Sequence, residues 1–196
     1  MAERKKYIEV KVPLLNSNIR VLGTPKELDK RTIKLDLSRK MRGKGIFVKF
    51  RIFLAEKELV AVPNRLEIST NYIRKIMRKR TSYVEDSFNA KCSDIRARVK
   101  PILITRKKVS RAVRKNLRNT AREFLLEYLS KKDFCEAFSD VLNGELQKSM
   151  LPRLKKIYPL SFCDIRILET KDILKIDLEK ILKEDEPEKE AEKEDD

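Results

Sequence analysis

The stretch Ile95–Leu129, IRARVKPILITRKKVSRAVRKNLRNTAREFLLEYL, carries a strand pattern that is followed by the clearest helix pattern of the chain. In its first part Ile95, Ala97, Val99 and Leu103 lie on one face and cations on the other, which predicts a β-strand. Pro101 inside that run indicates an edge strand or a bulge. From residue 106 onwards apolar residues recur with the period of an α-helix, so a helix is predicted to follow over 106–129.

Other strands are predicted on both sides of this stretch. They cover residues 8–12, 33–37, 46–54, 59–62, 84–92 and 163–167. In the strongest of them, IFVKFRIFL, the residues at 46, 48, 50, 52 and 54 share one apolar face. Further helices are predicted from Ser69 or Thr70, over 133–142, up to about residue 157 with Pro152 inside it, and over 176–183. Strands and helices that alternate irregularly favour the α+β class.

The acidic residues are unevenly distributed. The whole chain has 47 Lys and Arg against 31 Asp and Glu, but residues 184–196 alone hold nine acids and two lysines. This segment lacks large apolar residues and is predicted to be a disordered acidic tail. The remaining 1–183 are predicted to form a single domain, strand-rich over 5–62 and mixed over 66–183.

Residues 1–183 contain 45 basic and 22 acidic residues, a net charge of +23. A folded body with that excess repels itself unless a polyanion neutralises it, and nucleic acid is the usual polyanion. A membrane partner is not expected, because no apolar run reaches the length of a span and no segment joins a basic face to an exposed apolar one.

The sequence lacks the side chain that most often acts as a general base in enzymes. The chain has no His, which removes the commonest general base and histidine-ligated zinc. Cys92, Cys135 and Cys163 are too far apart for a zinc knuckle and are expected to be small core residues of a reducing compartment. Three acids, Glu85, Asp86 and Asp94, leave a metal-dependent nuclease open as a minor alternative, although Glu85 and Asp86 are adjacent on a predicted strand and would point to opposite faces. We therefore expect no enzyme, no cofactor and no metal.

The cations are concentrated between residues 95 and 122, where eleven of 28 residues are Lys or Arg and none is acidic. On a helix, Lys107, Arg111, Arg114, Lys115, Arg118 and Arg122 fall on one side. A solvated helix face normally mixes signs, because oppositely charged residues one turn apart stabilise it. A row without acids predicts phosphate binding instead.

Further cations gather at the N-terminus, in the glycine loop near Gly43, and near residues 74–80. Spread over several elements, they favour a protein embedded in folded RNA over one with a single recognition helix. The predicted RNA-binding residues are Arg4, Lys5, Lys6, Arg39, Lys40, Arg42, Lys44, Arg74, Lys75, Arg78, Lys79, Arg80, Arg96, Arg98, Arg106, Lys107, Lys108, Arg111, Arg114, Lys115, Arg118 and Arg122. Tyr7, Tyr72 and Tyr83 are candidates for stacking on bases, although core positions are commoner for tyrosine.

Several long stretches resemble one ribosomal family. The run TSYVEDSFNAKCSDIRARVKPILITRKKVSRAVRKNLRNTAREFLLEYL (81–129) resembles the core of the small-subunit ribosomal protein family shared by archaea and eukaryotes, whose older name is S-three-A. LEISTNYIRKIMRK (66–79), KKIYPLSFCDIRILETK (155–171), RTIKLDL (31–37) and IFVKFRIF (46–53) fit the same family in the same order. The short basic N-terminus is similar to archaeal members, and the acidic tail matches nothing in the family.

The resemblance implies a non-catalytic protein with a β-barrel-like, antiparallel or mixed sheet core and appended helices. It implies binding to small-subunit ribosomal RNA at the platform, near the messenger exit and the 3′ end of the RNA. The implied partners are neighbouring small-subunit proteins of the platform, with messenger RNA at the exit as a further candidate, and the implied location is the cytoplasmic ribosome. The stretch 106–115 corresponds to the family's basic segment at the start of its long helix. A free RNA- or DNA-binding regulator remains the alternative.

Overall fold

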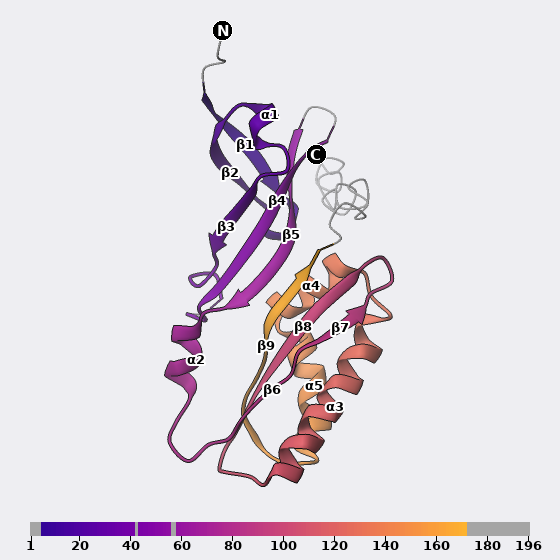
Figure 1. Ribbon diagram of the computed structural model, residues 1–196. Coiled ribbons are helices and arrows are strands. Elements are labelled where there is room, and N and C mark those ends of the chain that lie inside the picture. The colour runs from indigo at the N-terminus through magenta and orange to yellow at the C-terminus, as the bar shows by residue number, and fades with distance from the viewer. Residues whose placement is uncertain (1–4, 42, 56–57, 172–196) are drawn as a thin grey trace, which may run out of the picture. The chain divides into compact units, whose positions relative to one another are not determined.

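The computed structural model describes residues 5–41, 43–55 and 58–171, and Figure 1 shows how its elements follow one another. This part of the chain contains nine strands, five α-helices and one short 3-10 helix. In chain order they are β1 (Lys6–Val12), the 3-10 helix (Pro13–Leu15), β2 (Ser17–Gly23), α1 (Pro25–Leu28), β3 (Thr32–Asp36), β4 (Ile46–Ala55), β5 (Glu58–Ile68), α2 (Thr70–Ile76), β6 (Tyr83–Glu85), β7 (Phe88–Lys91), β8 (Arg96–Thr105), α3 (Arg111–Leu129), α4 (Phe134–Asn143), α5 (Glu145–Lys155) and β9 (Leu160–Thr170).

The chain divides into two compact units. The described residues of the first unit fall within 5–33 and 51–62, and those of the second within 34–50 and 63–171. The long strands β4 and β5 contribute residues to both units. The prediction of a single domain over 1–183 stays a prediction, and the predicted helix over 176–183 and tail over 184–196 lie outside the described residues.

The first unit is built on a β-hairpin. Strands β1 and β2 pair antiparallel from Lys6 opposite Gly23 to Val12 opposite Ser17, and β1 lies parallel to the start of β5. Side chains at alternate positions of β1, such as Val10, are buried, as the period of two predicts. Sequence periodicity alone did not predict β2 or α1. The latter is one turn long and begins where the Thr24 side chain accepts a hydrogen bond from the backbone N–H of Glu27.

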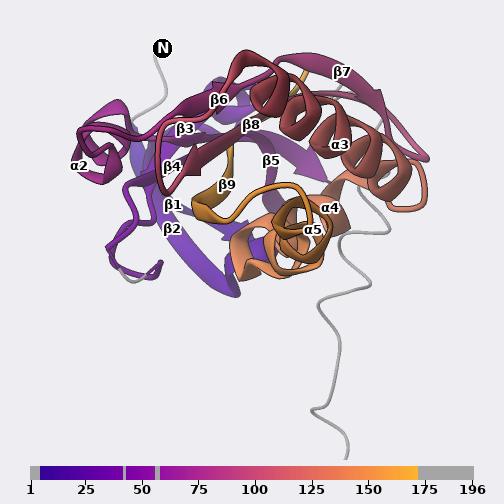
Figure 2. The same ribbon diagram turned by 90° about the horizontal axis from the view of Figure 1, so that it is seen from below.

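The second unit is a sheet covered on one face by helices. Strand β8 pairs antiparallel with β9, β6 and β7, and β9 pairs antiparallel with the second half of β5. Helix α3 packs on β6 and β7, α5 packs on β9, and α4 packs on α5 (Figure 2). Phe134, Phe138 and Leu117 are fully buried in the core between these layers. The expected α+β class, with a mostly antiparallel, open sheet and appended helices, is confirmed.

The pairing of β8 with β9 has a bulge at the proline, as the sequence predicts, and the extra residue lies in β9, between Ile165 and Ile167. The pairing register with β9 shifts between Lys100 and Pro101, where the missing proline N–H interrupts the hydrogen-bond ladder. Before the shift, buried and exposed side chains alternate, as in the sequence. After it, every residue from Ile102 to Thr105 is buried, so both faces of this half of the strand are covered.

Three details of the predicted elements are wrong. The segment predicted as one strand over 84–92 is two strands, β6 and β7. Leu54 is 45% exposed, whereas its neighbour Phe53 is buried, so the buried face of β4 does not continue to Leu54 as predicted. The predicted helix over 106–129 begins only at Arg111, where the Ser110 side chain accepts a hydrogen bond from the N–H of Val113.

Candidate nucleic-acid interface

Helix α3 presents one cationic face over its first three turns. Its members, the α3 ridge, are Arg111, Arg114, Lys115, Arg118 and Arg122. Four of them are exposed and Arg114 is half-buried. The opposite side of the helix packs on the core. The helix is thus amphipathic as predicted, and successive ridge cations lie about one turn, or 5.4 Å, apart.

No ridge cation has an acidic partner among the described residues. Other cations of the second unit do: Arg166 pairs with Glu85 at 2.8 Å, and Arg153 with Glu127 at 3.0 Å. The pairing with Arg153 also lowers the pKa of the Glu127 carboxyl below its usual value. These two acids therefore pair with other cations, and no ion pair with a described acid offsets the positive charge of the ridge.

The ridge ends at Arg122 for a structural reason. Leu125 and Leu129 come next on the same side of the helix, and both are fully buried. Arg122 itself lies over the ring of Phe88 in β7, with its guanidinium carbon 5.4 Å from the ring centre. This contact keeps the last guanidinium of the ridge beside the sheet.

The segment between β8 and α3 is basic but not helical. Arg106, Lys107 and Lys108 are all exposed there. Because α3 begins only at Arg111, Lys107 precedes the helix instead of lying on it. The segment is held by hydroxyl groups: Ser82 Oγ accepts from the N–H of Val109 at 3.1 Å, and Thr105 Oγ1 donates to the carbonyl of Lys107 at 2.6 Å. These bonds replace the helical bonds that periodicity predicted.

A second basic group lies on α2 and after it. Arg74 and Lys75 are exposed on the helix, and Arg78, Lys79 and Arg80 are exposed in the connection that follows. Figure 2 shows α2 and α3 well apart, with β6 and β8 between them. The two basic groups of this unit therefore lie on different sides of it.

The remaining predicted residues are scattered. Arg39 and Lys40 are exposed in the loop before β4, and Lys5 and Lys6 are exposed in the first unit, where Lys5 lies 4.0 Å from Glu27. Lys44 is tied to the buried carboxylate of Asp164 at 3.0 Å. Arg4 and Arg42 lie outside the described residues.

Arg96 and Arg98 project from the exposed face of β8, as the alternation predicts. Arg98 is 3.7 Å from Glu169 and donates to Ser87 Oγ. The sequence-based prediction missed two exposed lysines close by, Lys91 at the end of β7 and Lys171 after β9. The alternation of apolar and polar residues in FNAK (88–91) would have predicted that Lys91 is exposed.

The candidate tyrosines differ in exposure. Tyr7 is 74% exposed on β1. Tyr72 is half-buried, with its ring edge-on to Phe162 at 6.3 Å. Tyr83 is half-buried and donates to Glu85 at 2.5 Å; burial and this bond raise the pKa of Tyr83 to about 12. Of the three, Tyr7 is the one whose ring is open to a stacking partner.

The acids considered for a nuclease have structural roles. Asp94 accepts a hydrogen bond from the N–H of Phe134 at the start of α4, and Asp86 accepts from the N–H of Ser87. Over the described ranges, no three side chains of the metal-binding types gather so as to hold an ion. Burial raises the pKa of both Cys92 and Cys163 to about 12, so neither thiol is an activated nucleophile.

The model of the Ribosomal S3Ae family matches residues 2–172. The chain belongs to this family. It is 30% identical over 107 residues to the small ribosomal subunit protein eS1 of Methanothermobacter thermautotrophicus, covering 53% of this chain and 55% of that protein. It is 28% identical over 177 residues to the protein of the same name from Nanoarchaeum equitans, covering 84% and 87% of the two chains.

A third relative, the small ribosomal subunit protein eS1 of Archaeoglobus fulgidus, is 26% identical over 106 residues, or 54% of this chain and 50% of that protein. The match thus spans about half the length of two of these relatives and most of the third. The S3Ae chain described here has no helix, in its described part, that is long and apolar enough to cross a membrane.

Proposed function

We propose that this S3Ae chain is a structural constituent of the small ribosomal subunit and binds ribosomal RNA through the α3 ridge. The observation that carries the proposal is a row of exposed cations without acidic partners in the described structure. Such a row is costly in an isolated protein, because like charges one turn apart repel each other. RNA phosphates would remove that repulsion and release counterions on binding.

The family assignment and the names of the relatives support the same role, since these relatives are small-subunit proteins. We place the chain at the platform, near the messenger exit and the 3′ end of the RNA, in the cytoplasmic ribosome. Its partners would be ribosomal RNA and neighbouring small-subunit proteins, with messenger RNA as a further ligand. This role requires no catalytic step.

The proposed contacts are not equal in weight. The α3 ridge and the exposed cations at 106–108 have no ion pair with an acid of the described residues that would compete with phosphate. The cations of α2 and of the loop before β4 would form further contacts on other sides. Lys44 and Arg98 already have acidic partners at 3.0 and 3.7 Å, so their contribution to phosphate binding would be smaller.

The first test replaces Arg111, Arg114 and Arg118 together by Glu. We expect the variant to keep its circular dichroism spectrum, because these side chains are not core residues. Its affinity for a structured fragment of small-subunit ribosomal RNA should fall at least about tenfold, and the salt slope of binding should fall by about three. Filter-binding titrations at several salt concentrations measure both quantities.

The matched control reverses three exposed cations of α5 and its end, Lys148, Lys155 and Lys156, and so changes the net charge equally. If this control weakens RNA binding as much as the ridge variant does, net charge and not the ridge determines affinity. A sucrose gradient of native lysate tests the ribosomal role itself. Migration with the small subunit is expected, and migration as free protein would favour a free nucleic-acid-binding regulator.

A further inference from the structure

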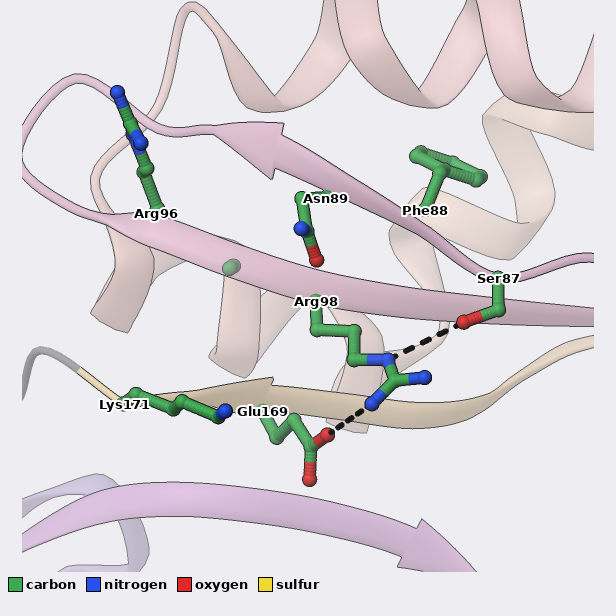
Figure 3. A pocket seen from close by; sticks show the side chains of 8 residues that line it. Ser87, Phe88, Asn89, Arg96, Arg98, Glu169 and Lys171 are labelled. Carbon is green, nitrogen blue, oxygen red and sulfur yellow. Dashed lines mark hydrogen bonds and ion pairs between the residues drawn. The ribbon is translucent and has the colours of Figure 1, made fainter.

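A pocket of about 390 Å³ opens on the second unit, at the ends of β7, β8 and β9. Its lining residues are Ser87, Phe88, Asn89, Arg96, Ala97, Arg98, Glu169 and Lys171. Figure 3 shows Phe88 pointing towards the helices, whereas Asn89, Arg98 and Glu169 lie on the other face of the sheet. The volume is in the range of pockets that hold small ligands.

Three polar side chains of the pocket, Asn89, Arg98 and Glu169, belong to one row across the sheet. Strand register places Asn89 opposite Arg98, Arg98 opposite Glu169, and Glu169 opposite Arg65. Residues directly opposite each other on neighbouring strands project from the same face. Four strands therefore each place one polar side chain in a line, and three of these side chains line the pocket, whereas Arg65 lies next to them.

The internal bonds of the row hold it in place without using all its hydrogen-bonding capacity. Glu169 accepts from Arg65 at 2.8 Å through one oxygen, while its other oxygen is 3.7 Å from Arg98, too far for a hydrogen bond. Arg98 donates through Nε to Ser87 Oγ at 3.2 Å, which leaves terminal N–H groups available. The Asn89 amide has no hydrogen bond to any described residue.

The pocket thus offers a free carboxylate oxygen beside free guanidinium and amide groups, and cations surround it. Lys171 extends towards Glu169, and Arg96 lies at the rim and points away (Figure 3). Three cations against one carboxylate leave an excess of positive charge. A phosphate group suits the cations, but only a ligand that also donates N–H groups suits the carboxylate.

We propose that this pocket binds a single unpaired nucleotide of RNA. The base edge would contact Arg98, Glu169 and Asn89, and the flanking phosphates would contact Lys171 and Arg96. The proposal deepens the proposed RNA-binding function and rests on it. An acidic peptide is disfavoured because Glu169 would repel its carboxylates. Unpaired bases in RNA loops, in contrast, are commonly recognised by hydrogen bonds to their edges.

Guanine fits this arrangement better than the other bases. Its edge carries an acceptor oxygen next to two N–H donors, so a guanidinium can donate to it while a carboxylate accepts from it. Adenine, cytosine and uracil each lack the pair of adjacent donors. Phe88 is only 6% exposed and its ring points towards the helices (Figure 3), so recognition would depend on the base edge and not on stacking against an aromatic ring.

The test uses the full-length protein and fluorescence anisotropy with four labelled RNA pentamers, UUGUU, UUAUU, UUCUU and UUUUU. The wild type should bind UUGUU about tenfold more tightly than the other three. Asn89→Ala, which changes no charge, should weaken UUGUU binding about fivefold. Lys148→Gln removes a distant exposed cation, and its preference for UUGUU should remain that of the wild type.

Glu169→Gln distinguishes a guanine-specific pocket from a simple cationic patch most sharply, because it removes a negative charge. If the surface were only a cationic patch, this variant would bind all four pentamers more tightly. The pocket instead requires the carboxylate, so the preference for guanine should disappear. Circular dichroism and thermal melting check the fold. A wild type that binds the four pentamers equally, or Asn89→Ala and Glu169→Gln variants that keep the preference, overturns the proposal.

Binding of a structured ribosomal RNA fragment distinguishes failure of the pocket proposal from failure of the proposed RNA-binding function. If that fragment binds through the α3 ridge but no pentamer shows the preference, the pocket proposal fails alone. If neither RNA binds, the proposed function fails as well. A hexaglutamate peptide that binds, and does so more weakly to Asn89→Ala, would assign the pocket to a protein partner and overturn the nucleotide proposal.

Discussion

Asp164 in β9 is a buried carboxylate that joins three parts of the second unit. It accepts hydrogen bonds from Gln147 Nε2 in α5 at 2.6 Å and from Lys44 Nζ at 3.0 Å. Gln147 also donates to the carbonyl of Val141 at the end of α4. A buried charge is tolerated only when it is paired and hydrogen-bonded, so these partners stabilise one another.

Replacing Asp164 by Ala should lower the free energy of unfolding by about 3 kcal/mol, because it leaves the Gln147 amide and the Lys44 ammonium without their acceptor. Urea denaturation measures the change. Glu123→Ala, at an exposed position of α3, is the control and should leave stability nearly unchanged. Equal stability of the two variants would contradict the role assigned to Asp164.

At the scale of elements, a single residue joins α4 to α5. Gly144 ends the first helix and precedes the second, with a φ of 80°. This left-handed conformation costs any residue with a Cβ atom some free energy, and glycine is the usual choice at a helix C-terminus. A Cβ atom at this position would meet only the Gln147 side chain, at 4.0 Å.

Gly144→Ala should therefore destabilise the protein by about 1 kcal/mol, through the backbone alone. Gly144→Asn should cost less, because asparagine tolerates this conformation better than alanine does. Thermal unfolding of the two variants beside the wild type makes the comparison. An alanine variant as stable as the asparagine variant would show that the helix connection does not depend on this conformation.

For the whole molecule, net charge is the dominant property. Residues 184–196 hold nine acids and two lysines, while the rest of the chain carries +23. A covalently attached polyanion lowers the positive potential that RNA experiences, whatever its conformation. The measured affinity for RNA therefore depends on both parts of the chain.

Removal of residues 184–196 should strengthen binding to double-stranded RNA at about 0.1 M salt, and the gain should disappear near about 1 M, where charges are screened within a few ångströms. Filter binding at the two salt concentrations gives the comparison. A chain in which an uncharged Gly/Ser segment of equal length replaces the acidic one should behave like the truncated chain. Unchanged affinity of both variants at low salt would contradict the expected effect of charge.

Local patterns in the sequence determined the α+β class, the positions of most strands, and the helix that carries the α3 ridge. Period-two alternation predicted β4 and the first half of β8, and the helical period from residue 111 onwards predicted the cationic face of α3. These features follow from residues that are neighbours in the chain, so a short window contains the information. The start of α3 was misplaced because hydroxyls of Ser82 and Thr105, outside the helix, hold the segment before it.

Only the tertiary structure decided which cations are paired and which side chains meet. Lys44 and Asp164 are 120 positions apart, and the row from Asn89 to Arg65 depends on the registers of four strands. Charge counts along the sequence cannot separate Arg98, which has an acidic neighbour, from Arg118, which has none among the described residues. The physical reason is that an ion pair requires contact within a few ångströms, and strand register, which brings distant segments together, sets that contact.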